Sequence, residues 1–240
     1  AQTKGFFVEQ VGSLADHQMM GGDVSVFWHF YRDLIPYLRN QGSLLNLGSG
    51  ISFAFETFCR QQNNNLSITC VDRLQPKAKP EFIDRFVVGD IESDIEIPGN
   101  PKFDVVCFFE VLEHVDRTDA VIKNAIRHCR AGGLVMLSFP NLASIYARIE
   151  LLLGFQPHVL EVSNERANLG AGFFGRYNNP KDQPIHHIRG ITSRAGKELA
   201  QYHGLKVREM LGTSGGRFHA LWKYLPGIAP VNVMICELAR

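Results

Sequence analysis

The stretch LLNLGSG at residues 44–50 decides the fold class of this chain. An apolar run typical of a buried strand stops at Gly48-Ser49-Gly50, and the helix-like residues 51–62 come directly after it. A strand that turns through two glycines into a helix leaves backbone N–H groups open and lets a ligand approach the main chain closely. Because such a turn can also be nothing more than a tight turn, its meaning depends on the residues further along the chain.

Strands and helices alternate through most of the sequence. Apolar runs predict strands at 43–47, 66–71, 83–88, 103–109, 133–139, 205–211 and 231–237. Helical spacing predicts helices at 24–40, 51–62, 117–130, 143–153 and 193–202. The first five strands are apolar with little alternation, as expected of a parallel sheet covered on both faces. The sequence therefore predicts a doubly wound α/β fold with a mostly parallel, seven-stranded, Rossmann-like sheet.

Composition fits one domain over residues 1–240, which 45% hydrophobic content can supply with a sizeable core. We expect an N-terminal helical extension (1–42), a core (43–140), an insertion (141–190) between strands five and six, and the last part of the sheet (191–240). Within the insertion, residues 154–190 carry Gly, Asn, Pro and aromatic residues without a regular period. Such a stretch predicts a structureless, mobile lid over the substrate.

Charge and cysteine content narrow the class of protein. The net charge is only +1, so no nucleic-acid partner is expected. The five cysteines form no C-x-x-C pair, which indicates buried thiols in a reducing compartment. No signal peptide and no membrane-spanning run are predicted, so we expect a cytoplasmic protein. The basic, aromatic lid hints at a small-molecule substrate of anionic or glycosyl-like character.

Polar residues stand where the first three strands end. Gly48 and Gly50 offer main-chain groups to an amino-acid tail, and Asp72, about 20 residues later, offers an acceptor to a ribose diol. Asp90 can accept a hydrogen bond from an adenine amine. Each residue alone could be a turn or cap residue. Together, in register with the strand ends, they favour a ligand with an adenosyl group.

The block Glu110-Val-Leu-Glu113-His114 comes after the fourth strand. A helical turn would place its two carboxylates and its imidazole on one face. Paired carboxylates need a shared cation or proton, and with an imidazole they form a ligand set for a divalent metal. The alternatives are that Glu110 lines the cofactor site, Glu113 caps a helix and His114 is a general base or a structural residue.

With these motifs the chain resembles the class I S-adenosylmethionine-dependent methyltransferases, in the branch with the E-V-L-E-H-V signature that includes the ubiquinone-biosynthesis O-methyltransferases. LLNLGSG, CVD, VVGDIE, FDVVCFFEVLEHV and GGLVMLSFPN occur in the family's order between residues 44 and 141. The resemblance implies methyl transfer from S-adenosylmethionine to a small molecule, with oxygen favoured as acceptor. The chain departs from the family at Asn46, where Asp or Glu is usual, and at Ser52, where a third glycine is usual.

The resemblance also assigns residues. It implies a cofactor site formed by Asn46, Gly48, Ser49, Gly50, Asp72, Arg73, Asp90, Ile91, Phe109 and Glu110. It implies catalytic roles for Glu113 and His114. The small-RNA 3′-terminal 2′-O-methyltransferases have an E-x-x-E-H block and a later histidine, and His187 stands similarly before Thr192. A metal site of Glu110, Glu113, His114 and His187, holding Mg²⁺, Mn²⁺ or Zn²⁺, is the matching expectation, with His114 as a metal-free base the alternative.

Two other functions remain open at this point. A cofactor-binding protein of the same fold without turnover would fit the uncharged Asn46. A nicotinamide-dependent oxidoreductase would need a third glycine for close helix–strand packing, and the sequence Gly48-Ser-Gly50-Ile-Ser-Phe53 lacks it.

Overall fold

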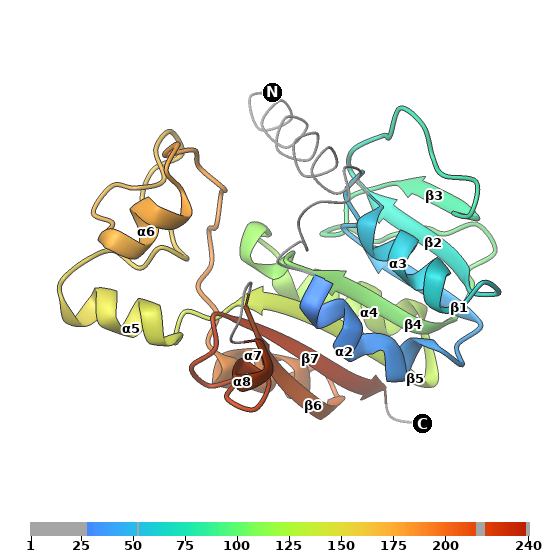
Figure 1. Ribbon diagram of the computed structural model, residues 1–240. Coiled ribbons are helices and arrows are strands. Elements are labelled where there is room, and N and C mark those ends of the chain that lie inside the picture. Colours follow the sequence, from blue (N-terminus) through green and yellow to red (C-terminus); the bar gives the residue numbers. More distant parts are fainter. Residues whose placement is uncertain (1–27, 52, 215–218, 239–240) are drawn as a thin grey trace.

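The computed structural model describes residues 28–51, 53–214 and 219–238, and Figure 1 shows its elements. Residues 24–27 of the predicted N-terminal helix, the rest of the extension before them, and Ser52 lie outside the described residues. The remaining part of that helix is α2 (Trp28–Leu38).

Seven strands form one sheet in the order β3-β2-β1-β4-β5-β7-β6. Their bounds are β1 (Ser43–Leu47), β2 (Ser67–Asp72), β3 (Arg85–Val88), β4 (Phe103–Phe109), β5 (Cys129–Pro140), β6 (Leu205–Thr213) and β7 (Val231–Leu238). The first five strands pair in parallel, whereas β7 runs antiparallel to both β5 and β6. The predicted mostly parallel, seven-stranded fold is confirmed.

Helices cover both faces of the sheet. On one face, α2 and α3 (Ala54–Gln62) pack in a core that includes Leu44 of β1. On the other face, α4 (Thr118–His128) and α7 (Ser193–Tyr202) pack in a core that includes Leu45 and Leu47. Adjacent residues of β1 therefore enter opposite cores, as the period of two requires. Asn46 shares the face of Leu44, toward α2 and α3.

In the insertion between β5 and β6, α5 (Ile145–Leu152) confirms the helix predicted at 143–153. Residues 154–190 depart from the prediction of a structureless lid, because they contain α6 (Phe173–Asn178) and a bridge between Gln156 and Ala171. In Figure 1 this arm extends to one side of the sheet, beyond the carboxyl end of β5, and returns to α7 through an extended segment. Ser144 begins α5 by accepting a hydrogen bond from the Ala147 N–H, so the helix starts two residues later than predicted.

Smaller differences concern element ends. β5 starts at Cys129 rather than 133, because a register shift opposite Phe103–Val105 lets the strand begin earlier. A short helix, α8 (His219–Trp222), was not predicted. All five cysteines are buried free thiols, as expected. Over the described residues, no helix is both long and apolar enough to span a membrane.

Candidate active site at the carboxyl ends of the strands

The turn after β1 needs its glycines, as the sequence predicts, but its N–H groups are not open: those of Gly48, Ser49 and Gly50 all donate hydrogen bonds within the protein. Gly48 and Gly50 adopt φ values of +72° and +65°, a region that side chains disfavour. A Cβ on Gly48 would lie 2.8 Å from Cγ2 of Val111, so the position also lacks room for a side chain. The N–H groups of Gly48 and Ser49 donate to the Val71 carbonyl of β2 at 2.8 and 3.3 Å. The turn is thus fastened to the neighbouring strand.

Asp72, at the end of β2, joins the first two strand tips. Its Oδ2 accepts a hydrogen bond from the Gly50 N–H at 2.8 Å, and its Oδ1 accepts from the Leu74 N–H at 2.8 Å. Burial raises the pKa of the Asp72 carboxyl, while these two N–H groups oppose the rise. A carboxylate oxygen accepts more than one hydrogen bond, so acceptor capacity for a diol remains beside the glycine turn.

Arg73 links the tips of the second and third strands. Its guanidinium lies 2.9 Å from Oδ1 of Asp90 and 2.7 Å from Oε1 of Glu92. Glu92 is buried, and its Oε2 accepts a hydrogen bond from the Arg117 N–H. Ile91, between the two acids, is buried with its Cδ1 near Gly48. Of the cofactor candidates, Ile91 thus lies beside Gly48, while Arg73 and Asp90 form an ion pair at the adjoining strand ends.

Asn46 has a partner that the sequence did not indicate. Its Nδ2 donates a 2.6 Å hydrogen bond to Oε1 of Glu56, in the first turn of α3. Both side chains are buried, and Oδ1 of Asn46 has no hydrogen-bond partner among the described residues. A carboxyl group is therefore present behind the β1 turn although residue 46 is uncharged. No spacing rule points to residue 56, because the contact depends on how α3 packs on the sheet.

Glu110 does not continue into a helical turn, which corrects the prediction. Its φ is +51°, and only Leu112–His114 form a turn of 3₁₀ helix, η1. The buried Ser138 of β5 holds Glu110 in this conformation. The Ser138 hydroxyl donates to Oε1 of Glu110 at 2.6 Å and accepts from the Glu110 N–H at 3.0 Å. The Glu110 carboxylate, together with Phe109 before it, lies at the carboxyl end of β4, where we predicted the cofactor.

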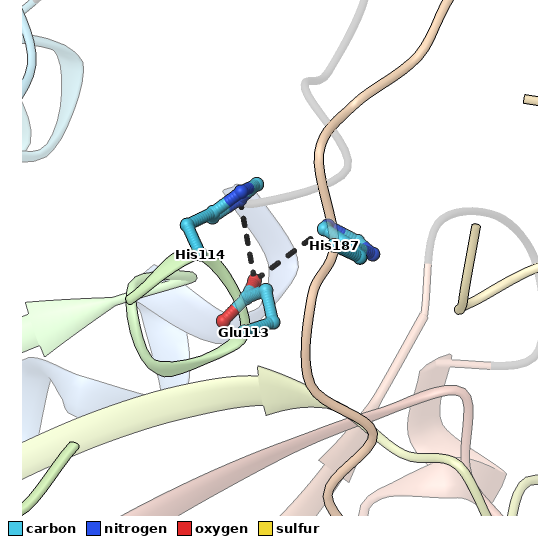
Figure 2. A group of neighbouring side chains, drawn as sticks. All are labelled: Glu113, His114 and His187. Atoms are coloured by element: carbon cyan, nitrogen blue, oxygen red, sulfur yellow. Dashed lines mark ion pairs between the residues drawn. The ribbon is translucent and has the colours of Figure 1, made fainter. Parts of the chain in front are cut away.

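Glu113, His114 and His187 form one group (Figure 2). Oε1 of Glu113 lies 3.8 Å from Nε2 of His114 and 3.9 Å from Nε2 of His187. One ligand atom from each residue lies within 4.8 Å of the others, and Glu110 is not part of this group. Glu113 and His114 come from η1, whereas His187 comes from the segment that leads back from α6. Three of the four expected metal ligands therefore lie together, whereas Glu110, the fourth, does not join them.

Backbone carbonyls fix the orientation of both imidazoles. Nδ1 of His114 lies 3.1 Å from the His186 carbonyl, and Nδ1 of His187 lies 3.1 Å from the Val159 carbonyl. A carbonyl only accepts, so each Nδ1 carries the proton and each Nε2 presents a lone pair toward Glu113. An imidazole whose other nitrogen donates to a carbonyl is the arrangement found in metal-binding histidines.

Burial drives the three ionisable side chains of this group toward their neutral forms. Glu113 is 1% exposed, and neither of its oxygens has a hydrogen-bond partner among the described residues. Burial, with the nearby Glu110, raises the pKa of Glu113 well above its usual range. Burial lowers the pKa of His114, and burial together with His114 lowers the pKa of His187 to about 3. A divalent ion between the Glu113 carboxyl and the two neutral imidazoles would stabilise the ionised form of Glu113.

The chain matches a family model described as a methyltransferase domain over residues 23–210. Among curated proteins, it is 34% identical to the mitochondrial ubiquinone biosynthesis O-methyltransferase of Candida albicans over 67 residues. That match covers 28% of this chain and only 20% of the Candida protein.

Solved structures show the same fold at low identity. A putative methyltransferase complexed with the Trm112 activator from Haloferax volcanii has 11% identity and a TM-score of 0.59, covering 97% of this chain and 95% of that one. The methyltransferase domain of bacterial CtHen1-CN has 16% identity and a TM-score of 0.53, covering 88% and 98%. Human N-acetylserotonin methyltransferase with bound S-adenosylmethionine has 15% identity and a TM-score of 0.54, covering 89% and 53%. The glycine turn, the acidic strand tips and the family match together show that the chain belongs to the methyltransferase-domain family, in its S-adenosylmethionine-dependent class.

Proposed function

We propose that the protein transfers the methyl group of S-adenosylmethionine to an oxygen atom of a small molecule, with a divalent cation held by Glu113, His114 and His187. The observation that carries the proposal is the buried Glu113 carboxylate, which has no hydrogen-bond partner among the described residues and faces two imidazole lone pairs. Without a cation, this side chain bears either the desolvation cost of a buried charge or the cost of the protonation that its raised pKa indicates.

Distances support the fit of an ion. Ligand atoms about 2.1 Å from one ion are at most about 4.2 Å apart. The two carboxylate–imidazole distances, 3.8 and 3.9 Å, already lie within that limit. Because Glu110 is bound to Ser138 and lies outside the group, the ligand set contains two nitrogens and one carboxylate. This set suits Zn²⁺ or Mn²⁺ better than Mg²⁺, which prefers oxygen ligands.

The residues have separate tasks in the proposed reaction. The glycine turn and Asp72 bind the cofactor, and the strand tips hold it in line with the acceptor. A divalent ion held by Glu113, His114 and His187 would supply Lewis acidity and lower the pKa of an acceptor hydroxyl. An alcohol oxygen gains most from this effect, because it is a weak nucleophile until its proton leaves. The neutral Nε2 of His114 is the alternative acceptor for that proton if the protein works without a metal.

Removal of metal by a chelator distinguishes the metal-dependent mechanism (the metal version) from the mechanism with His114 as base (the base version). The purified protein, treated with EDTA, would be incubated with radiolabelled S-adenosylmethionine and an untargeted metabolite extract, with and without added Zn²⁺ or Mn²⁺. The metal version requires turnover that depends on the ion, with cofactor binding unchanged by EDTA. Turnover that persists in EDTA and is lost in His114→Ala would support the base version.

Two variants extend the test, and one serves as control. Glu113→Ala and His187→Ala should behave like chelated wild-type protein. Glu165→Ala removes an exposed carboxylate elsewhere on the arm and should leave turnover intact. Cofactor binding with no methylated product from any fraction would instead favour a cofactor-binding protein without turnover.

A further inference from the structure

A five-residue segment of the arm, residues 185–189, carries His187 to the site, and we call it the strap. Its last part is tied to the core, because the N–H groups of Ile188 and Arg189 donate to the Glu113 carbonyl at 2.8 and 3.2 Å. Its first part is tied to the arm. Oε1 of Glu161 accepts a hydrogen bond from the Ile185 N–H at 2.7 Å, and Oε2 accepts from the His186 N–H at 2.6 Å. One carboxylate thus binds two successive N–H groups.

The backbone of the strap is strained where Glu161 binds it. His186 has φ = +60°, which is uncommon for a residue with a side chain. Such a conformation costs about 1–3 kcal/mol and persists where surrounding contacts impose it. Successive N–H groups around a left-handed residue converge on one point and form an anion-binding concavity. The two Glu161 oxygens lie at that point, so the carboxylate compensates the strain.

The strained residue has a direct effect on the site. The His186 carbonyl accepts the hydrogen bond from Nδ1 of His114, which leaves Nε2 of His114 facing Glu113. The next side chain along the strap is His187, whose Nε2 faces the same Glu113 oxygen. Glu161 is therefore connected to both imidazoles through one peptide segment.

We propose that Glu161 is a positioning residue, which clamps the strap so that the His186 carbonyl selects the Nδ1–H tautomer of His114 and His187 is presented to Glu113. This rests on the proposed function in so far as the lone pairs serve to bind a metal. The competing explanation is that Glu161 only closes the arm, in which case its loss would lower stability and leave the imidazoles unchanged.

The tautomer of His114 distinguishes these explanations. Two-bond ¹⁵N–¹H spectra of the imidazoles in metal-free protein report which ring nitrogen carries the proton. We expect the Nδ1–H form in wild type. Glu161→Gln keeps the shape of the side chain but replaces one accepting oxygen by a donor, so one of the two strap hydrogen bonds is lost. In this variant His114 should become a mixture that includes the Nε2–H form.

Controls separate positioning from folding. Glu165→Gln removes the same charge from an exposed residue four positions along the arm and should leave the spectrum unchanged. Glu161→Asp, which keeps the charge but shortens the reach, provides a second variant if Glu161→Gln does not fold. An unchanged Nδ1–H tautomer of His114 in a folded Glu161 variant would overturn the proposal, as would an Nε2–H tautomer in wild type.

A second measurement concerns the metal itself. Titration with Co²⁺, monitored by its visible absorption, should show binding about 10–100-fold weaker in Glu161→Gln than in wild type, the range typical for loss of an orienting contact. Wild-type protein that binds no Co²⁺, Zn²⁺ or Mn²⁺ would contradict the proposed metal site. The His114 tautomer in the Glu161 variant would still test the positioning role of Glu161. Failure of the proposed metal site and failure of the role of Glu161 are therefore distinguishable.

Discussion

The amide of Asn46 and the carboxyl of Glu56 form one buried unit behind the glycine turn. Nδ2 of Asn46 donates to Oε1 of Glu56 at 2.6 Å, and the Cys70 thiol donates to the same oxygen at 3.4 Å. The family usually has its acidic residue on the strand, at the position of Asn46. In this chain the carboxyl comes from α3 and contacts the strand amide. The unit therefore keeps an acidic group next to the turn while reversing which element supplies it.

This reversal can be tested by exchanging the two groups. Asn46→Asp would place a second carboxyl within hydrogen-bond distance of Glu56 in a buried environment, where two like charges cannot both ionise. We expect a loss of about 1–3 kcal/mol in the free energy of unfolding at pH 7. Asn46→Asp/Glu56→Gln, which exchanges the two groups, should recover most of it in urea denaturation. Equal stabilities of Asn46→Asp and wild type would show that the unit is not rigid.

Glu56 gives a dependence of stability on pH. Burial raises the pKa of its carboxyl above 4.5, although the Asn46 hydrogen bond opposes the rise. The folded state then holds a proton that the unfolded state has lost, so this group's contribution to stability is present below pH 4.5 and falls as pH rises through the folded pKa. Glu56→Gln should be more stable than wild type at about pH 8, with little difference at about pH 4. A gap between the two that did not grow with pH would contradict this.

We expect Glu113 to lower the stability of the metal-free protein and to be required for metal binding. Glu113→Gln removes a buried carboxyl whose pKa is raised well above its usual range and whose oxygens have no hydrogen-bond partner within the described part of the chain. The amide that replaces it can donate toward the imidazole lone pairs. We expect metal-free Glu113→Gln to be more stable than metal-free wild type by about 1–3 kcal/mol at pH 8. Added Zn²⁺ should raise the melting temperature of wild type and leave the variant unchanged. Zn²⁺ that stabilises both proteins equally would place the ion elsewhere.

Asp72 should bind the cofactor and also fasten the turn. Asp72→Asn keeps the shape but replaces one oxygen that accepts from a backbone N–H by a donor. Calorimetry with the demethylated cofactor should show binding weaker by about 1.5–3 kcal/mol, because two ribose hydroxyls lose a charged acceptor. Asp84→Asn, at the entrance of β3, is the matched control. Tighter binding of NAD than of the methyl donor would contradict the cofactor assignment.

The arm should be cleaved before the core. Phe173 and Tyr177 of α6 are 73% and 74% exposed, and Tyr202 of α7 and Tyr224 are similarly exposed. With limited chymotrypsin we expect the first cuts within residues 154–190, because this arm has few contacts with the sheet, and we expect cofactor with metal to slow them. Initial cleavage at Tyr202 or Tyr224, with no effect of ligands, would rule out a lid that closes on the substrate.

The sheet could be predicted from the sequence because its cores are encoded locally. Val, Ile, Leu and Phe runs mark each strand, and parallel pairing brings successive strand ends to one edge. The residues at those ends, such as Gly48 and Asp72, therefore lie close together even though the sequence does not show their contacts. The same reasoning failed for α6, a six-residue helix whose side chain Phe174 packs on Tyr146 of α5, at 5.1 Å between ring centroids.

The details of the metal candidate could not be predicted in the same way. Glu110 left the expected helical turn because Ser138, on a different strand, binds its N–H and its carboxylate. The carbonyls that orient the two imidazoles belong to His186 and Val159, and every residue has a carbonyl, so no sequence pattern marks them. The role proposed for Glu161 could not be predicted from the sequence either. It depends on the left-handed backbone of His186, which is not a glycine and so gives no signal in the sequence.

The strap has a consequence for the whole protein. The His114 ring and the carbonyl that holds it are 72 positions apart in the chain. An ion shared by His114 and His187 would act as a reversible cross-link, joining η1 to the end of the arm as a disulfide joins distant loops. Ligand binding only to the folded state adds about 2.7 kcal/mol at about 100 times the dissociation constant. The concentration of available metal would then set how often the end of the arm separates from η1. It would thereby affect how readily the protein is degraded, independently of any methyl transfer.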